Sequence, residues 1–416
     1  MAMRPPRGTH DLLGAEMARF RHVVETGRRV FARYGFTEWE TPIFEETGVF
    51  ARSLGESSDV VSKEMYSFED RSGDSLTLRP EGTAGICRAL VTNGLTQTLP
   101  QRVFYQGPMF RYERPQKGRY REFHQIGAEF LGADDSLRDA ETIAMAADFL
   151  EALGLGDDVT LELNTLGNKA SRQAWREALI AHFSRFENDL SADSRARLRV
   201  NPLRILDSKH EGDKALVADA PAFAGYLDDE SKRFWDDVRQ ALSAFGVVWR
   251  DNPLIVRGLD YYSHTAFEFV TDKLGAQGTV LAGGRYEDLV AEMGGPAVPA
   301  IGWAAGVERL SALIEAPHQS TSPLAILPMG GATTAKAAEL ARQLRRAGHV
   351  VQIETRGNMK KRLERTLKAG AKLAVFVGEE ELAQGQVQLR NLEDRTQQTL
   401  PEGALLQALE SAKPRG

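Results

Sequence analysis

The pattern of apolar and polar positions near the middle of the chain predicts two strands joined by a turn. Residues 103–105 form a short apolar and aromatic run, and residues 123–130 alternate between apolar and polar side chains. β-Branched and aromatic residues dominate both flanks, as they do in strands. Pro115 and Gly118 lie between the flanks and favour a turn. The pattern therefore predicts a long antiparallel hairpin.

Helical and strand periods also alternate through the N-terminal part of the chain. Apolar residues at helical spacing predict a helix over residues 16–34, and a strand-like stretch with Pro42 follows it. Residues 65–69 and 75–79 predict a second hairpin. Residues 84–94 predict a helix that begins shortly after that hairpin.

The character of the sequence changes after a further helix at 139–153 and a strand at 159–166. From about residue 168 to 247 the chain holds long amphipathic segments and few strand signals, which predicts a helical subdomain. Strand signals then resume, and we expect strands at 254–256 and 265–270, then a strand followed by a helix over 301–314. The pair Gly283 and Gly284 indicates either a close approach of the backbone to another group or a simple turn.

The C-terminal part of the chain follows a different pattern. Residues 316–323 are polar and bounded by prolines, which predicts a linker. After it, short apolar strands alternate with helices up to about residue 391, beginning with a strand at 324–329. This alternation predicts a mostly parallel sheet covered by helices.

Composition narrows the class of protein. The 416 residues suffice for more than one domain, and no stretch reaches the roughly 18 consecutive apolar residues that a membrane helix needs. The N-terminus lacks the apolar core of a secretory signal. The single cysteine, Cys87, excludes an intramolecular disulfide and a CxxC metal site, and its apolar neighbours favour a small buried side chain over a nucleophile. We therefore expect a cytoplasmic protein with no membrane partner.

Positive charge is concentrated at the tip of the central hairpin, although the formal net charge is −6. Beside the acids Glu113 and Glu122 the tip holds a group of cations, namely Arg111, Arg114, Lys117, Arg119 and Arg121. Guanidinium groups bind phosphate oxygens through paired hydrogen bonds. Local patches, rather than the net charge, decide whether a protein binds a polyanion. The tip therefore predicts phosphate binding, with a solvated basic turn as the alternative.

Several sequence blocks carry more specific information. They read RPEGTA at 79–84, FRYERPQKGRYREFHQ at 110–125, RGLDYYSHTAFEF at 257–269, AGGRYEDLV at 282–290 and GVERL at 306–310. Together they resemble the signature blocks of the histidyl-tRNA synthetases, a family of class II aminoacyl-tRNA synthetases. The second block resembles class II motif 2, and GVERL resembles motif 3. The predicted helix at 16–34 and the strand-like stretch with Pro42 that follows it resemble motif 1. The resemblance runs from RGTHD near the N-terminus into the C-terminal domain.

The resemblance implies a fold in three parts. An α+β catalytic domain, with the antiparallel sheet and flanking helices of class II synthetases, is expected at 1–168 and 251–317. A helical insertion domain at 169–250 would contact the acceptor arm of tRNA, and an α/β anticodon-binding domain would follow at 323–416. Motif 1 builds the dimer interface in this family, so we expect a homodimer.

The resemblance also implies the reaction of a histidine–tRNA ligase. Histidine and ATP would give histidyl-adenylate and pyrophosphate, and the histidyl group would then pass to the 3′ end of histidine tRNA. Negative charge that builds at phosphorus requires cations placed there beforehand. The sequence shows no zinc-type cluster and no P-loop, so arginines and Mg2+ would hold the phosphates, and we name no metal-binding residue.

The family motifs assign roles to individual residues. By resemblance, Arg257 and Arg111 would be the catalytic residues at the α-phosphate. The binding residues implied are Arg111, Glu113, Arg119, Phe123 and Arg309 for ATP; Glu81, Thr83, Gln125, Glu129, Tyr261 and Tyr262 for histidine; and Arg114 and Gln116 for the acceptor end of tRNA. Glu129 and Tyr262 would face the imidazole, because a site that hydrogen-bonds both ring nitrogens rejects analogues that lack them.

Simpler roles remain open for some of these residues. Glu81 and Thr83 stand at a strand-to-helix junction, where a carboxylate and a hydroxyl can simply cap the helix. Tyr261 and Tyr262 can simply pack in a core with satisfied hydroxyl groups.

Two other functions fit parts of the sequence. A synthetase paralogue that senses histidine or regulates its biosynthesis would share the fold without charging tRNA. Such paralogues typically lose part of RGLDYY, the motif arginines or the C-terminal domain, all of which are present here. A non-catalytic RNA-binding module would use the basic patches but would not need RPEGT or AGGRY. Histidine-dependent exchange of pyrophosphate into ATP separates a ligase from both.

Overall fold

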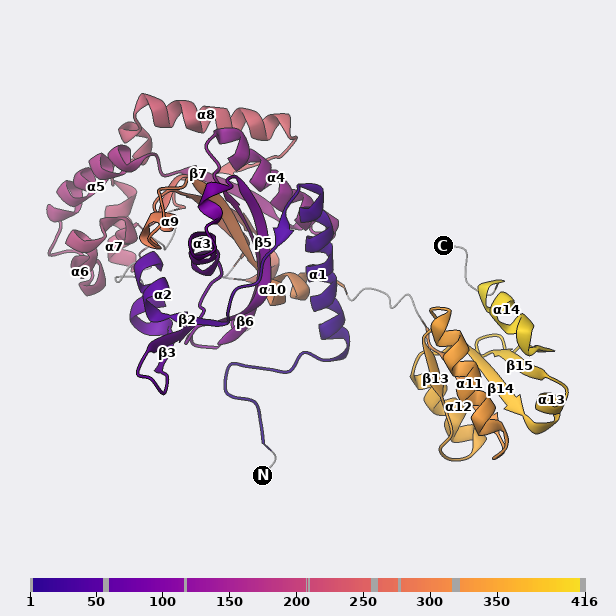
Figure 1. Cartoon of the computed structure of the whole chain (residues 1–416). Helices are drawn as coiled ribbons and strands as arrows, with labels where there is room; N and C mark the ends of the chain where they lie inside the picture. The colour runs from indigo at the N-terminus through magenta and orange to yellow at the C-terminus, as the bar shows by residue number, and fades with distance from the viewer. Residues whose placement is uncertain are drawn as a thin grey trace. The chain divides into compact units, whose positions relative to one another are not determined.

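A computed structural model of the chain describes residues 3–54, 60–115, 118–206, 208, 210–255, 261–275, 278–315 and 322–411 (Figure 1). The chain divides into two compact units, Met1–Pro317 and His318–Gly416, and each is described by itself. Most of the predicted linker, from 316 to 321, lies outside the described residues. Within the described ranges, no helix is both long and apolar enough to cross a bilayer.

The first unit is organised around an eight-stranded sheet with the order β1-β5-β6-β11-β10-β9-β7-β8. The strands are β1 (Thr37–Glu38), β5 (Gln101–Phe110), β6 (Glu122–Leu131), β7 (Thr160–Thr165), β8 (Arg250–Asp251), β9 (Tyr262–Val270), β10 (Thr279–Tyr286) and β11 (Ala300–Gly306). Neighbours from β5 to β7 pair antiparallel, and only the two short edge strands pair parallel. The predicted central hairpin is confirmed as β5 and β6, with Gln101 opposite Leu131 and Phe110 opposite Glu122.

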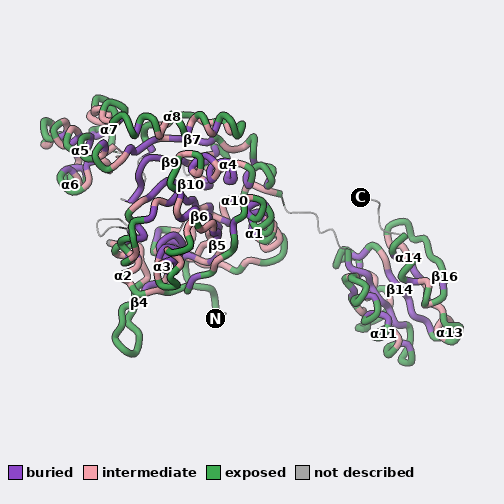
Figure 2. The backbone as a smooth tube through the Cα atoms, turned by 45° about the horizontal axis from the view of Figure 1, so that its top comes forward, coloured by how far each residue is buried: buried purple, intermediate pink, exposed green. Residues whose placement is uncertain are grey.

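Helices cover both faces of this sheet, and its strands are mostly buried (Figure 2). One core lies against α1 (Gly14–Arg33), α4 (Ser136–Ala152), α8 (Asp229–Ala244) and α10 (Val307–Leu313). The other core includes residues of α2 (Thr47–Leu54), α3 (Thr83–Thr92) and α9 (Leu289–Glu292). Alternate side chains of a strand point to opposite faces, so Phe104 of β5 joins the first core while Val103 and Tyr105 join the second. Cys87 is fully buried in the second core, as the sequence predicts.

A small three-stranded sheet stands beside the large one, in the order β2 (Phe44–Glu46), β4 (Ser75–Leu78) and β3 (Tyr66–Glu69). β3 and β4 pair antiparallel and confirm the second predicted hairpin. The α1 helix likewise confirms the helix predicted over 16–34, because Val23, Val24, Val30 and Phe31 recur at helical spacing and are buried.

Three helices, α5 (Lys169–Ser184), α6 (Ala192–Val200) and α7 (Glu211–Ala218), lie between β7 and α8 and confirm the predicted helical character of this region. They share a small core around Trp175. Asn168 and Asp228 cap α5 and α8 by accepting hydrogen bonds from the N–H groups of Ser171 and Ser231. The Asn168 amide also donates to Asp228 at 2.6 Å, so both ends of the helical region are tied at one junction. The boundaries of an insertion domain remain a prediction.

The prediction of a strand at 254–256 is wrong at 254 and 255, the two of these positions that the structure describes. The chain forms the short strand β8 earlier and then turns at Pro253 and Leu254. The Asn252 side chain accepts a hydrogen bond from the Leu254 N–H at 3.0 Å. Such local side-chain bonds compete with strand pairing. Val256 lies outside the described residues.

The second unit contains a five-stranded sheet in the order β13 (Val351–Ile353), β12 (Leu324–Met329), β14 (Leu373–Gly378), β15 (Gln386–Asn391) and β16 (Gln397–Pro401). α11 (Thr333–Arg346) and α14 (Leu405–Ser411) pack on one face and α12 (Met359–Lys368) on the other, with α13 (Glu379–Ala383) between β14 and β15. The first three strands are parallel as predicted, but β15 and β16 are antiparallel. The connection 379–385 is too short for a parallel crossover, which takes about a dozen residues.

Candidate active site

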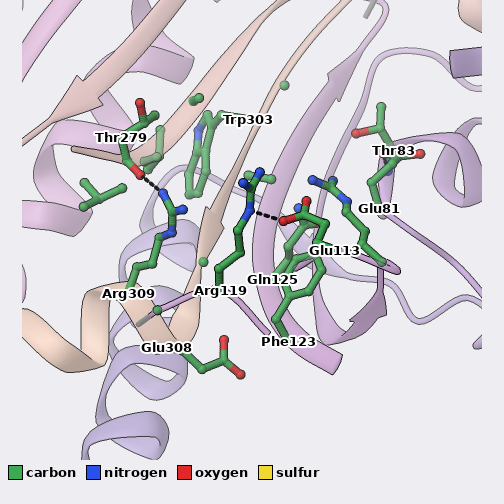
Figure 3. Close-up of a pocket in the computed structure, with 18 of the residues that line it drawn as sticks. Glu81, Thr83, Glu113, Arg119, Phe123, Gln125, Thr279, Trp303, Glu308 and Arg309 are labelled. Carbon is green, nitrogen blue, oxygen red and sulfur yellow. Dashed lines mark hydrogen bonds and ion pairs between the residues drawn. The ribbon is translucent and has the colours of Figure 1, made fainter. Parts of the chain in front are cut away.

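A pocket of about 260 Å³ lies on the large sheet beside Glu113 and Arg119, which lie between β5 and β6 in the chain (Figure 3). It is lined by most of the positions that the sequence motifs single out, namely Glu81, Thr83, Arg111, Glu113, Arg119, Phe123, Gln125, Glu129, Tyr261, Tyr262 and Arg309. Arg114 is exposed and is not part of this lining. Arg257 and Gln116 lie outside the described residues. The fold thus brings together residues from segments far apart in the chain.

A buried carboxyl group, that of Glu129 on β6, forms a polar end of the pocket. Glu129 is 1% exposed, and the hydroxyl groups of Thr83 and Tyr286 each donate a hydrogen bond to it at 2.8 Å. Burial raises the pKa of Glu129 from 4.5 to about 8, although the two hydroxyl donors oppose the rise; the charge of Glu81 adds to it. Glu129 therefore carries a proton at neutral pH.

Glu81 lines the pocket and also caps the start of a helix. Its carboxylate accepts hydrogen bonds from the N–H groups of Thr83 at 2.6 Å and Ala84 at 2.9 Å, in the first turn of α3. Burial raises the pKa of Glu81, and these N–H donors and the charge of Arg111 oppose the rise. The capping role left open by the sequence is therefore confirmed. Contact of Glu81 with histidine remains a prediction.

Three tyrosines form the aromatic wall next to Glu129. The ring centroids of Tyr261 and Tyr262 lie 4.6 Å apart, and Tyr286 meets Tyr261 edge to face at 5.6 Å. All three belong to the second core and also line the pocket, so packing and pocket formation are not exclusive. Tyr286 is not among the site residues predicted from the sequence. Its place at the end of AGGRY, opposite Tyr262 in the β9–β10 pairing, is the signal that identifies it.

Glycines on neighbouring strands make room for the polar end of the pocket. Gly302 of β11 lies opposite Glu129 in register, and a Cβ atom at position 302 would overlap the Glu129 carboxyl group. Gly283 and Gly284 lie within β10, and a Cβ atom at position 283 would overlap the Gly302 carbonyl oxygen. Close backbone approach is therefore the right interpretation of this glycine pair, and the simple turn is wrong.

Three guanidinium groups, of Arg111, Arg119 and Arg309, line another part of the pocket. Figure 3 shows those of Arg119 and Arg309. Arg309 donates to the Thr279 carbonyl oxygen at 2.6 Å, Arg119 forms an ion pair with Glu113, and Arg111 donates to a backbone carbonyl oxygen at 2.9 Å. Burial lowers the pKa of Arg309, and the charges of Arg119 and Arg111 lower it further. Because these like charges repel one another, a bound anion would stabilise this part of the pocket.

Phe123 and Gln125 lie on β6 before Glu129, on the same face of the strand. The Arg111 guanidinium lies 5.3 Å from the centroid of the Phe123 ring. The side-chain oxygen of Gln125 is buried, and no described residue donates a hydrogen bond to it. A buried acceptor without a partner is costly, so a ligand that donates to this oxygen gains affinity.

Glu308 is a second pocket residue that the sequence analysis missed, although it is adjacent to Arg309 in GVERL. Its carboxylate accepts from the His124 N–H at 2.9 Å and contacts His124 Nδ1 at 2.7 Å. These contacts tie the start of α10 to β6 and so hold Arg309 against the sheet.

Arg285 of the AGGRY block has a structural position outside the pocket lining. It donates to both carboxylate oxygens of Asp139 on α4, at 2.8 and 3.1 Å, and the pair is almost fully buried. His264 lies nearby, where β9 holds extra residues opposite β10, and has a φ of 44°. Burial lowers the pKa of His264 to about 4, with Arg285 and Arg172 contributing, so its ring is neutral.

An antiparallel sheet that presents arginines from a hairpin loop and from the helix after its β11 strand is the catalytic architecture of a class II aminoacyl-tRNA synthetase. Residues 8–310 match the histidyl-tRNA synthetase family, and residues 324–412 match the anticodon-binding domain family. The chain belongs to the histidyl-tRNA synthetase family.

Individual relatives agree with this assignment. A histidine–tRNA ligase of Gluconobacter oxydans (strain 621H) is 66% identical over 411 residues, which cover 99% of each chain. The apo S. aureus histidyl-tRNA synthetase superposes with a TM-score of 0.84 at 31% identity, covering 98% of this chain and 99% of that one. A Bacillus halodurans C protein described as an ATP phosphoribosyltransferase regulatory subunit/histidyl-tRNA synthetase shares the fold, with a TM-score of 0.67 at 19% identity and coverage of 91% and 99%. The predicted family and fold class are thereby confirmed, while the roles of individual pocket residues remain predictions.

Proposed function

We propose that this chain is a histidine–tRNA ligase, an ATP-dependent enzyme that activates histidine and transfers it to tRNA. The observation that carries the proposal is the composition of one pocket, in a chain that belongs to the histidyl-tRNA synthetase family. The pocket holds a buried carboxyl group that has hydroxyl partners and a raised pKa, and it also holds a cluster of guanidinium groups. The carboxyl group and its hydroxyl partners suit the polar side chain of an amino acid, and the guanidinium groups suit phosphates.

The polar end suits an imidazole ring. A neutral imidazole has one N–H donor and one acceptor nitrogen. The neutral carboxyl group of Glu129 and the hydroxyl group of Tyr262 can each donate or accept, so the pair can satisfy both ring nitrogens. Thr83 and Tyr286 would keep the Glu129 carboxyl group in place while the ring binds. Tyr261 would pack against the ring.

The amino-acid backbone of histidine would bind beside the imidazole site. Its α-ammonium group can donate to the unpartnered side-chain oxygen of Gln125. The carboxylate of Glu81 offsets the ammonium charge, and Thr83 adds a hydroxyl group at the same end of α3. This arrangement leaves the histidine carboxylate free to reach the arginines.

The arginines would act in the first step of the reaction. A carboxylate oxygen of histidine attacks the α-phosphorus of ATP, the bond from this phosphorus to the bridging oxygen breaks, and pyrophosphate leaves. Arg111 would stabilise the charge that grows on the α-phosphate oxygens, while Arg119 and Arg309 would hold the outer phosphates. Phe123 would stack on adenine, and Glu113 would orient Arg119 through their ion pair. Arg257 remains a predicted second donor at the α-phosphate.

Mg2+ fits this site as an ion that binds together with ATP. Within the described part of the chain, no group of three or more His, Cys, Asp or Glu side chains could hold a metal ion. Mg2+ is commonly bound by substrate phosphates and one or two carboxylates, and Glu113 is a carboxylate beside the arginines. Bound Mg2+ would neutralise phosphate charge. We expect excess EDTA to abolish the exchange activity and added Mg2+ to restore it.

In the second step, a ribose hydroxyl oxygen at the 3′ end of tRNA attacks the histidyl carbonyl carbon and releases its proton to solvent. The bond from this carbon to the phosphate oxygen breaks, and AMP leaves. Arg114 is exposed on the hairpin loop, where a phosphate of the acceptor end can reach it. We propose that Arg114 and Gln116 contact histidine tRNA there.

We also propose a homodimer. Phe44, Tyr66 and Leu78 lie in one row across the small sheet, Phe68 lies on the same face, and the exposed Tyr112 packs edge to face on Tyr66. Contiguous exposed apolar faces commonly mark interfaces. A second copy of the chain is the expected partner, and sedimentation of the purified protein as a monomer would contradict this. The single cysteine and the substrates ATP and tRNA favour a cytoplasmic location, which cell fractionation tests.

The test of the function is exchange of labelled pyrophosphate into ATP with each of the twenty amino acids, without tRNA. We expect exchange with histidine alone, followed by charging of histidine tRNA. A regulatory paralogue is the second candidate, because the fold is also that of a protein described in part as a regulatory subunit. A folded protein that binds histidine but gives no exchange would favour that candidate.

A further inference from the structure

The N-terminal segment before α1 packs against the loop that carries the pocket arginines. The ring of His10 stacks on the ring of Tyr120, with 4.3 Å between centroids and 28° between planes. The Gly8 carbonyl oxygen accepts a hydrogen bond from the Arg121 N–H at 2.8 Å. Tyr120 itself lines the pocket, directly after Arg119.

This segment is held in a defined conformation. The backbone N–H and the hydroxyl group of Thr9 both donate to the Pro6 carbonyl oxygen, at 3.1 and 2.9 Å. Gly8 has a φ of 89°, and a Cβ atom at this position would lie 2.8 Å from Arg121 Cγ. His10 Nε2 lies 3.2 Å from the Glu16 carboxylate on α1. The His10 ring therefore lies between Glu16 of α1 and Tyr120 of the loop, and it packs on the Tyr120 ring.

The restrained part of the loop is its return arm, residues 119–121. Arg119 enters the pocket and pairs with Glu113, and Arg121 donates from Nε to the Glu113 carbonyl oxygen at 3.2 Å. A shift of Tyr120 would move both arginines, because they are its neighbours in sequence. Ordering a flexible arm when the ligand binds costs affinity, and an arm that is already ordered avoids that cost.

We propose that His10 is a positioning residue for ATP, acting through Tyr120 on Arg119; this inference rests on the proposed ligase function. His10 does not line the pocket, so it acts without touching the substrate. The prediction concerns the binding of ATP alone, because the residues proposed to bind histidine, such as Glu129, Tyr262 and Thr83, lie outside the 119–121 arm.

The test compares His10→Ala with His10→Phe in the full-length protein. Loss of an aromatic pair, worth about 0.5–1.5 kcal/mol, corresponds to a roughly twofold to tenfold rise in the KM for ATP in pyrophosphate exchange. The KM for histidine should stay unchanged, and His10→Phe should restore the KM for ATP because it keeps the stacked ring. His22→Ala, on α1 and outside the pocket lining, is the matched control.

A second measurement does not depend on catalysis. Hydrogen exchange of a peptide spanning residues 118–122 should be faster in His10→Ala than in the wild type, and His10→Phe should return it to the wild-type rate. Unchanged exchange and unchanged KM for ATP, or equal rises in both KM values, would overturn the inference. Absence of histidine-dependent exchange in the wild type would instead contradict the ligase function, so the two failures are distinguishable.

Discussion

Replacing Glu129 by Gln should remove a large pH dependence from the stability of the first unit. Burial raises the pKa of Glu129 from 4.5 to about 8 in the folded protein, whereas the unfolded chain leaves it near its ordinary value. Between these pH values the folded state holds a proton that the unfolded state has released. The contribution of Glu129 to the free energy of unfolding is therefore fully present below pH 4.5 and is lost as the pH rises through about 8.

The size of this effect follows from the two pKa values. At 1.36 kcal/mol per pH unit, they correspond to about 5 kcal/mol of unfolding free energy between the two ends of the window. Glutamine keeps the shape and the hydrogen-bonding capacity of the side chain but does not titrate. The variant therefore lacks this pH-dependent part of the unfolding free energy. The Thr83 and Tyr286 hydroxyl groups can reorient to suit the amide.

Urea unfolding at pH 5 and pH 8.5, followed by tryptophan fluorescence, measures the difference. All tryptophans of the chain lie before residue 317, so the signal reports on the first unit alone. The stability of Glu129→Gln relative to the wild type should increase by several kcal/mol from pH 5 to pH 8.5. Glu151→Gln, which alters an exposed glutamate of α4, should show no such increase. If the unfolding free energies of the wild type and Glu129→Gln differ by the same amount at both pH values, the reasoning is refuted.

Three further predictions concern single pocket and loop positions. Arg257→Ala should lower the rate of histidyl-adenylate formation by about 10²–10³-fold, the usual effect of losing one transition-state donor; near-full activity in pyrophosphate exchange would remove it from the catalytic residues. Arg114→Ala should spare pyrophosphate exchange but impair charging of histidine tRNA, and equal losses in the two assays would argue against a tRNA role. Gly302→Ala should lower stability by about 1–3 kcal/mol and raise the KM for histidine, because its Cβ atom overlaps the Glu129 carboxyl group. Gly48→Ala, where a Cβ atom meets open space, is its control in thermal unfolding.

Strand periodicity explains why much of the pocket could be predicted from the sequence. Phe123, Gln125 and Glu129 occur at even spacing, so a strand places them on one face. Ile126, Ala128 and Phe130 then occupy the opposite face and are buried in the first core. Once the hairpin is recognised, these positions follow from local sequence alone.

Other parts of the site depend on strand register, which local sequence does not reveal. Tyr286 reaches Glu129 only because β10 pairs with both β9 and β11, and the β9–β10 pairing shifts register between Gly284 and Arg285. Arg285 illustrates the same limit, since its partner Asp139 is far away in sequence. The strand misplaced at 254–256 has a local cause, because the Asn252 side chain favours a turn there.

Two features of the sheet have one common origin. They are the burial that raises the pKa of Glu129 and the presence of glycine at positions next to the pocket. Tyr105 lies opposite Gly127, Glu129 lies opposite Gly302, and a side chain at either glycine would overlap its neighbour. The polar groups of the pocket are thus set among the strands themselves, where surrounding strands exclude water. Exclusion of water strengthens each hydrogen bond to a ligand and makes an unsatisfied group more costly. A sheet built in this way discriminates strongly for a ligand that satisfies every polar group, and the same burial makes it less stable in alkaline solution.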